Sequence, residues 1–201
     1  EGEDPLDLTG DAFTRGMAMF MNEAGWIAGD AYVCPPSDGA CEEHLFFVSP
    51  SGELVDLVAP ENLAVVTVGF TENNQLLFEA AEHAYLADPS GTIETLSVPS
   101  GALFPSVYGI TPDGSVIGGS AYIDAMGTPL RWVDGQVEIL PIPDGMTFSN
   151  TERGFSVAPD GSMVSGVRNN GSVLSHAVRW NVAGEVSLLP EPSGATSSVA
   201  A

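Results

Sequence analysis

The sequence predicts an all-β chain, a β-propeller-like array of four-stranded antiparallel blades. Two observations support this class: a phrase recurs four times, and tight-turn signals separate short apolar runs with no sustained helical period. The two clearest copies pair GITPDGSVIGG with LRWVDGQVEIL at residues 109–119 and 130–140, and SVAPDGSMVSG with VRWNVAGEVSLL at 156–166 and 178–189. Two more divergent copies precede them.

The spacing of the copies matches a four-stranded blade. A leucine closes the last apolar run of each copy, and successive leucines are 39, 44 and 49 residues apart, a mean period of 44. A propeller blade takes roughly 40–45 residues. The four leucines are Leu57, Leu96, Leu140 and Leu189.

The third copy illustrates the expected elements. Strands are predicted at 106–110, 115–122, 129–133 and 136–140. The turn at 111–114 contains Pro-Asp-Gly, in which proline presets φ and glycine accepts a positive φ. Asp134-Gly135 is a strong hairpin signal. In the second copy Asn74 stands where the other first turns have glycine, and asparagine tolerates the left-handed region.

The whole chain is predicted to be a single repeat domain, residues 1–201. Full repeats are expected at about 13–60, 61–100, 101–146 and 147–192, with partial repeat strands at 1–9 and 193–201. Either the chain is cut from a longer array, or its two end strands pair to close a ring. The end strands are also candidates for head-to-tail self-assembly.

The repeat resembles the HAF extracellular repeat family. The pattern is Gly-(Ile/Val)-(Ser/Thr)-Pro-Asp-Gly, then a small-residue strand, then His-Ala-aromatic, then a strand ending in leucine. His83-Ala84-Tyr85 and His176-Ala177-Val178 are the nearest matches to the tripeptide, and Thr128 replaces the histidine in copy three. The resemblance implies a secreted or surface, propeller-like protein without an assigned chemistry. WD40-like Pro-Asp-Gly repeats are a rival resemblance that shares the turn but lacks the His-Ala-aromatic strand.

The charge balance disfavours several partners. The chain has 27 acidic residues against five arginines and no lysine, a net charge of −22. It offers no basic stripe for nucleic acid or for an anionic membrane, and no apolar run is long enough for a membrane span. The acids are expected to form a solvated surface. Binding of a divalent cation such as calcium is the alternative, although no calcium-loop motif occurs, and no cofactor is predicted.

The two cysteines, Cys34 and Cys41, flank an inserted segment in the first copy. A local disulfide and an oxidising compartment (extracellular, cell-surface or periplasmic) are the prediction, because a metal site would need two more ligands. The segment between them is the candidate recognition loop, with residues Pro35, Pro36, Ser37 and Asp38.

The histidines and two of the tryptophans are predicted to be structural because they recur with the repeat. His44, His83 and His176 fall at the start of the third strand, where an imidazole is expected to satisfy backbone groups of a neighbouring strand. Trp132 and Trp180 are expected to pack between blades, at a position shared with Phe47 and Leu86. Arg131 and Arg179, next to them, are each expected to pair with a carboxylate.

No catalytic residue is assigned, since no nucleophile elbow, zinc motif or phosphate loop occurs. The first hypothesis is therefore a non-enzymatic extracellular or surface repeat protein for binding a protein or glycan partner, or for structural assembly. The alternative is a polysaccharide-acting hydrolase or lyase with its site in the propeller funnel. That alternative requires converging acids and aromatics, with at least one carboxyl of raised pKa.

Overall fold

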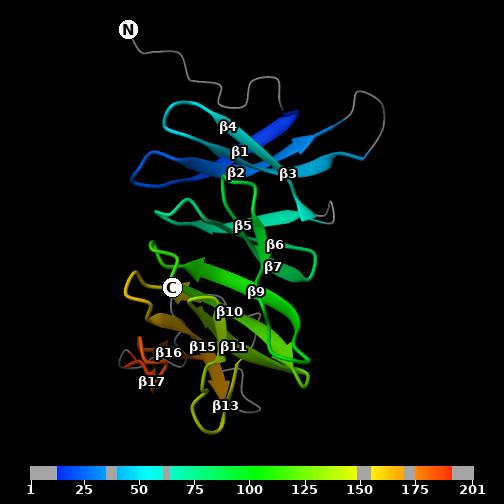
Figure 1. Cartoon of the computed structure of the whole chain (residues 1–201). Helices are drawn as coiled ribbons and strands as arrows, with labels where there is room; N and C mark the ends of the chain where they lie inside the picture. The colour runs from blue at the N-terminus through cyan, green and yellow to red at the C-terminus, as the bar shows by residue number, and fades with distance from the viewer. Residues whose placement is uncertain (1–12, 35–39, 61–63, 149–154, 170–174, 192–201) are drawn as a thin grey trace. The chain divides into compact units, whose positions relative to one another are not determined.

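The strands of this protein form four antiparallel sheets, each a meander in chain order. The computed structural model describes residues 13–34, 40–60, 64–148, 155–169 and 175–191 (Figure 1). Within these ranges the chain contains strands and turns but no helix, so it has no helix that could cross a membrane. The prediction of an all-β chain of four-stranded antiparallel meanders is confirmed for the first three copies, and the sheet of the fourth copy has five strands.

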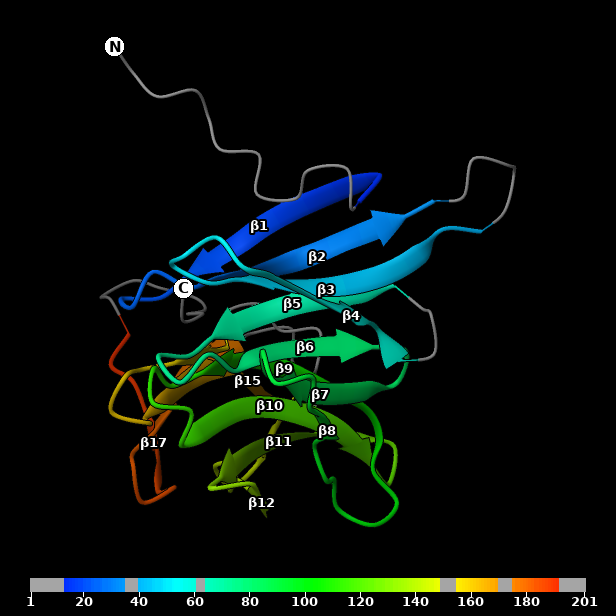
Figure 2. The ribbon, with the colours of Figure 1, turned by 45° about the horizontal axis from the view of Figure 1, so that its top comes forward.

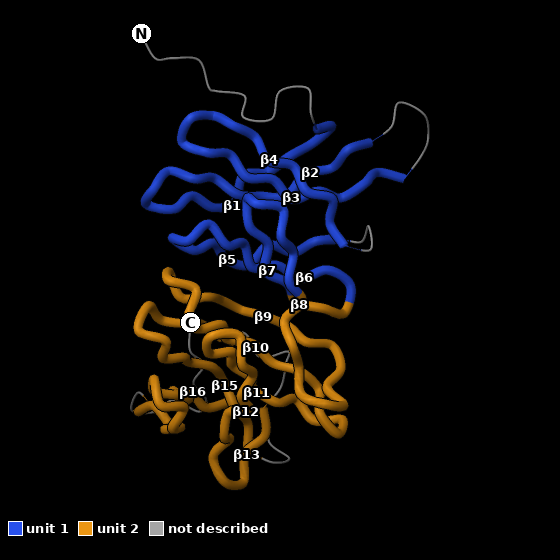
Figure 3. The backbone as a smooth tube through the Cα atoms, in the orientation of Figure 1, with its two compact units in different colours: residues 1–81, 85–94 blue, residues 82–84, 95–201 orange. Residues whose placement is uncertain are grey.

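Unit 1 comprises residues 1–81 and 85–94 (blue in Figure 3). Its two sheets lie face to face (Figure 2), and Leu45 and Phe47 of one are fully buried against Leu76 and Phe78 of the other. Each such side chain contributes about 1.5–3 kcal/mol by leaving water. The strands are β1 (Arg15–Met21), β2 (Ile27–Val33), β3 (Glu42–Val48) and β4 (Leu54–Val58), then β5 (Val65–Phe70), β6 (Leu76–Ala80), β7 (His83–Ala87) and β8 (Ile93–Thr95).

Unit 2 comprises residues 82–84 and 95–201 (orange in Figure 3), and so includes the first residues of β7 and the end of β8. The third sheet of the protein lies in unit 2 and has β9 (Leu103–Ile110), β10 (Val116–Ile123), β11 (Met126–Val133) and β12 (Gln136–Ile139). Its fourth sheet has β13 (Met146–Thr147), β14 (Ser156–Val157), β15 (Met163–Asn169), β16 (Ser175–Trp180) and β17 (Val186–Leu188). Both β13 and β14 pair with β15, so the first strand of this copy is in two pieces.

The hairpin formed by β10 and β11 is longer than predicted. The ladder continues to the pair Ile123–Met126, and a two-residue turn, Asp124-Ala125, closes it. Strand β11 therefore begins three residues before the predicted 129, and β9 extends back to Leu103, which pairs with Tyr122. The turn contains no glycine, proline or asparagine, which explains why the sequence pattern did not reveal it.

A bulge recurs in the first strand of three copies. The register shifts at Met19 in β1, at Val68 in β5 and at Tyr108 in β9, each three residues before the first residue of the following turn. Opposite the bulge in copy three lies Gly119, where an added Cβ would stand 2.4 Å from the carbonyl oxygen of Ser106. The bulge brings the two backbones too close for a side chain, which accounts for glycine there.

In the turns after these first strands, the fourth residue donates its N–H to the carbonyl of the first. In the second copy the Asn74 N–H donates to the Thr71 carbonyl at 3.1 Å, and Asn74 has φ 62°, confirming the predicted left-handed asparagine. Within unit 1 the Asn22 amide donates to the Thr71 carbonyl at 3.1 Å and to the Asn74 amide oxygen at 2.8 Å, which joins two turns. In copy three, donors from Thr111 and Ser115 hold the pKa of Asp113 at about 2.

The two repeat tryptophans are buried, as predicted, and each carries the same hydrogen bond. Trp132 is 1% exposed and Trp180 is 0% exposed. The Trp132 indole donates to the Ser97 carbonyl at 2.6 Å, and the Trp180 indole donates to the Pro141 carbonyl at 2.7 Å. Each acceptor directly follows the closing leucine of the preceding copy, so each tryptophan fastens its own third strand to the end of that copy.

The predicted alignment of these tryptophans with Phe47 and Leu86 is wrong by one residue. Trp132 pairs with Val137 and Trp180 with Val186, and in the first copy Val48 pairs with Leu54 in the corresponding place. Val48 and Ala87 therefore occupy the tryptophan position. The third-to-fourth-strand turn is shorter in copy three than in the other copies, and this difference shifted the alignment by sequence.

Candidate functional site

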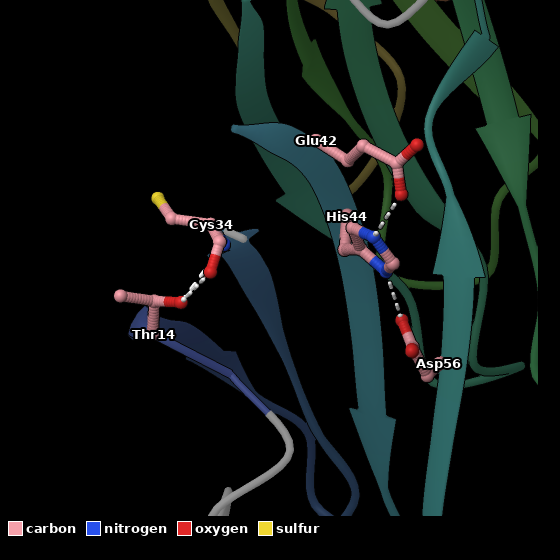
Figure 4. Close-up of polar contacts among 5 residues, drawn as sticks. All are labelled: Thr14, Cys34, Glu42, His44 and Asp56. Carbon is pink, nitrogen blue, oxygen red and sulfur yellow. Dashed lines mark hydrogen bonds and ion pairs between the residues drawn. The ribbon is translucent and has the colours of Figure 1, made fainter. Parts of the chain in front are cut away.

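The predicted disulfide is present. Cys34 and Cys41 are bonded with their Cα atoms 4.1 Å apart, across the connection between β2 and β3. The Thr14 hydroxyl accepts the Cys34 N–H at 2.8 Å, and its contact with the Cys34 carbonyl is drawn in Figure 4. The candidate recognition loop, Pro35, Pro36, Ser37 and Asp38, lies outside the described residues.

The histidines contact carboxylates rather than the expected backbone groups. In His44, which is buried, Nδ1 lies 2.6 Å from Asp56 and Nε2 lies 3.8 Å from Glu42 (Figure 4). In His176, Nδ1 bonds to Glu191 and Nε2 lies 3.0 Å from the Asn169 amide. The His83 side chain is exposed. His44 and His176 thus link neighbouring strands through their side chains. We therefore still interpret these histidines as structural.

Both arginines beside the tryptophans pair with carboxylates, as predicted. Arg131, 7% exposed, bonds to Glu138 at 2.7 Å and also donates to the Val182 carbonyl at 2.8 Å. Arg179 lies 3.8 Å from Asp160, and both side chains are about half exposed. The Arg131 pair holds neighbouring elements of unit 2 together, whereas the exposed Arg179 pair contributes little.

Unit 2 contains an apolar cleft, which we call the Tyr122 cleft. It consists of two cavities of about 380 and 530 Å³ that share Tyr122 and Ala125 as walls. The first is lined by Tyr122, Ala125, Met126, Gly127, Thr128, Ile142, Met146, Thr147 and Phe148, and the second by Gly101, Leu103, Phe104, Tyr122, Asp124 and Ala125. Both volumes lie within the usual range for ligand sites.

Three segments that are distant in the sequence build this cleft. The first is the start of β9, the second is the turn between β10 and β11, and the third runs from residue 142 to Phe148. A bridge between Gly127 and Phe148 joins the second segment to the third. Three large side chains stay exposed here: Leu103 at 59%, Phe104 at 52% and Met126 at 62%. Adjacent exposed apolar groups around a cavity are typical of binding surfaces.

The backbone of the cleft is left-handed at three residues. Phe104 has φ 50°, and Asp124 and Ala125, which form the β10–β11 turn, have φ 51° and 61°. The left-handed region disfavours side chains with a Cβ, and bulky ones most. The Asp134-Gly135 turn at the other end of β11 places glycine, at φ 76°, where this turn has Ala125. Phe104 and Ala125 are therefore the strained residues of the cleft.

A smaller acidic hollow lies in unit 1. Its volume is about 160 Å³, and its walls include Arg15, Asp30 and Tyr32. Burial raises the pKa of Asp30, opposed by the Thr67 hydroxyl, which donates to it at 3.4 Å. A hydrogen bond to the buried Glu43 raises the pKa of Tyr32. The hollow is thus lined by one carboxyl of raised pKa, Asp30, and the second carboxyl, Glu43, is buried beside its Tyr32 wall.

The part of the chain that the structure describes contains no candidate metal site. No group of three or more histidine, cysteine, aspartate or glutamate side chains converges there closely enough to hold an ion. Of the acidic residues expected at a solvated surface, Glu94, Asp113 and Asp144 are exposed, whereas Asp88 is half-buried and Glu43 is buried.

Comparisons with known proteins leave the chain without an assigned family. No protein-family profile matches the sequence, and no curated protein matches it either. The resemblance to HAF repeats therefore remains a prediction. The Tyr122 cleft was not predicted, because its glycine-free turn and its three separate segments give no local sequence signal.

Proposed function

We propose that this protein is a non-enzymatic, propeller-type binding protein of the cell exterior, and that the Tyr122 cleft is a ligand site. The observation that carries the proposal is the cleft itself: an apolar hollow of ligand size whose walls include strained backbone and exposed large side chains. Four meander sheets of one repeat supply a rigid scaffold, on which connecting segments perform recognition. The disulfide supports an oxidising compartment, extracellular, cell-surface or periplasmic.

Two further roles belong to the same proposal. The partner is a protein or glycan, and self-assembly through the end strands at 1–9 and 193–201 is a separate route that lies outside the described residues. The apolar lining of the Tyr122 cleft favours a partner that inserts apolar groups over one that offers only hydroxyls, because buried polar groups need hydrogen-bond partners.

A polysaccharide-acting hydrolase or lyase is the second candidate, and the acidic hollow of unit 1 favours it. Glycoside hydrolysis uses one carboxyl of raised pKa as an acid and a second carboxylate opposite it. Asp30 and Glu43 fit these two roles in type. The hollow, at about 160 Å³, is nevertheless smaller than the roughly 300 Å³ at which ligand sites usually begin, which places this candidate second.

The test of the binding proposal uses a neutral apolar dye, Nile red, with the full chain. We expect saturable fluorescence enhancement that Met126→Gln weakens several-fold, because the change puts an amide in place of a thioether at the cleft wall. The matched control is Met21→Gln, which alters an exposed methionine of β1 in unit 1, 73% exposed against 62% for Met126. If both variants bind the dye like the parent chain, the cleft is not the binding site.

The test of the enzyme candidate is separate. Release of reducing or unsaturated ends from a panel of polysaccharides, abolished by both Asp30→Asn and Glu43→Gln, would favour the hydrolase or lyase. Unchanged activity in both variants would remove the acidic hollow from consideration.

A further inference from the structure

The lining of the Tyr122 cleft suits apolar side chains of varied shape. Met126 and Met146 contribute flexible, polarisable thioethers, and Ile142 and Phe148 contribute aliphatic and aromatic surface. Methionine-rich surfaces adapt to different apolar partners. The two cavities share the walls Tyr122 and Ala125, so one ligand carrying two apolar groups can occupy both at once.

Asp124 is the one charged residue among the described residues that line the two cavities. Asp124 lines the larger cavity, and Asp144 lies between two residues that line the smaller one, Ile142 and Met146; both carboxylates are exposed. Among the described residues, no arginine or histidine lines either cavity. The nearest arginine in the register is Arg168, which pairs with Thr147 across β13 and β15. With a net charge of −22 over the whole chain, the potential at the rim repels anions and attracts cations.

The strand arrangement favours a polypeptide over a small molecule. Leu103 and Phe104 belong to β9, which is the edge strand of its sheet among the described strands. An edge strand can pair with an added extended peptide, whose alternate side chains then enter pockets on one face. The larger cavity lies beside this edge and provides one such pocket, and the smaller cavity adjoins it through the shared walls Tyr122 and Ala125.

We propose that the Tyr122 cleft binds an extended segment of a partner protein that carries two apolar side chains flanked by lysine or arginine. This inference rests on the proposed binding function and adds the chemistry of the ligand. The apolar side chains fill the two cavities, and the flanking cations lie at Asp124 and Asp144. Electrostatic complementarity of this kind selects partners and accelerates association.

The experiment compares two synthetic peptides with the full chain. Both contain the same alternating leucine and phenylalanine residues, flanked in one peptide by lysines and in the other by aspartates. Displacement of bound Nile red and calorimetric titration give the affinities at low and high ionic strength. The charge variant is Asp124→Asn, and its matched control is Asp134→Asn, which removes the same charge from the corresponding position of the turn at the other end of β11, at φ 48° rather than 51°.

We expect the lysine peptide to displace the dye at a concentration at least about tenfold lower than the aspartate peptide, with the difference shrinking at high ionic strength. Asp124→Asn should weaken the lysine peptide by about threefold, and Asp134→Asn should leave it unchanged, because an exposed pair contributes modestly and only at short range.

Other outcomes overturn the inference in distinguishable ways. If the dye binds but both peptides displace it equally, or neither does, the ligand is not a basic peptide while the binding function stands. If the lysine peptide binds without displacing the dye, it contacts another acidic surface and the inference fails. If the dye itself does not bind, the proposed function fails together with the inference.

Discussion

Replacing Ala125 with glycine should stabilise the protein, although it removes a methyl group from the cleft wall. Ala125 has φ 61° in a two-residue turn, where a Cβ costs about 1–2 kcal/mol relative to glycine. Glycine gains conformational freedom in the unfolded chain, which offsets about 0.4–1 kcal/mol of this. The expected net effect of Ala125→Gly is therefore an increase of about 0.8 kcal/mol in the free energy of unfolding, the midpoint of a range of about 0–1.6 kcal/mol.

Equilibrium unfolding in urea, followed by tryptophan fluorescence, measures this increase. Trp132 and Trp180 belong to unit 2, the unit that contains the turn, and Trp26 packs against the core of unit 1. An increase of this size corresponds to a rise of about 1–4 °C in Tm for a chain of this length. The affinity for Nile red should fall at the same time, because the lost methyl group lines both cavities.

The matched control is Ala81→Gly. Ala81 has φ 54° in the exposed turn between β6 and β7, away from the cleft lining. It should give a similar gain in stability with unchanged dye affinity. If Ala125→Gly left stability unchanged or lowered it while Ala81→Gly raised it, the strain assigned to the β10–β11 turn would be refuted. Equal loss of dye affinity in both variants would show that the methyl group of Ala125 does not contact the ligand.

Three further changes test other parts of the structure. Gly119→Ala should lower the free energy of unfolding by about 2 kcal/mol or more, because the new Cβ meets the Ser106 carbonyl at 2.4 Å and the Trp132 ring at 2.8 Å; a neutral result in urea unfolding would exclude the close approach. Asp30→Asn should stabilise the protein at neutral pH, since burial raises the pKa of Asp30 and stability is lost as pH rises through that pKa. The gain should vanish as the pH falls far enough to protonate Asp30, and a gain independent of pH would argue against burial as its cause. Cys34→Ser combined with Cys41→Ser should cost about 2 kcal/mol through the freed loop, and reduction of the parent protein should reproduce the loss.

The repeat made most of the fold predictable. The Asp134-Gly135 turn, the left-handed Asn74 and the burial of Trp132 and Trp180 follow from local chemistry that recurs in several copies. Where copies differ in turn length, alignment by sequence fails, as it did for Val48 and Ala87. An alignment error of one residue assigns a side chain to the wrong face of its sheet, because successive side chains of a strand point to opposite faces.

The Tyr122 cleft could not be predicted for a different reason. It depends on Phe104 and Ala125 adopting a backbone conformation that their residue types disfavour, and a pattern-based analysis assigns residues the conformation they prefer. It also depends on the two-piece first strand of the fourth copy, which brings Met146 beside a hairpin of the third. Sites formed against local preference are those that sequence patterns miss.

The indole-to-carbonyl hydrogen bonds of Trp132 and Trp180 determine where one of these repeats must be cut if it is to be engineered into another protein. Trp180 of the fourth copy donates to the Pro141 carbonyl, and the hydrophobic core of that copy includes Leu140. Two residues that stabilise the fourth copy therefore precede its first strand in the sequence. The segment that can be transferred to another protein as a unit therefore begins earlier in the sequence than the first strand of the repeat. A cassette that began at the first strand would leave its tryptophan without an acceptor, whereas one that began at the preceding leucine would carry its own fastening.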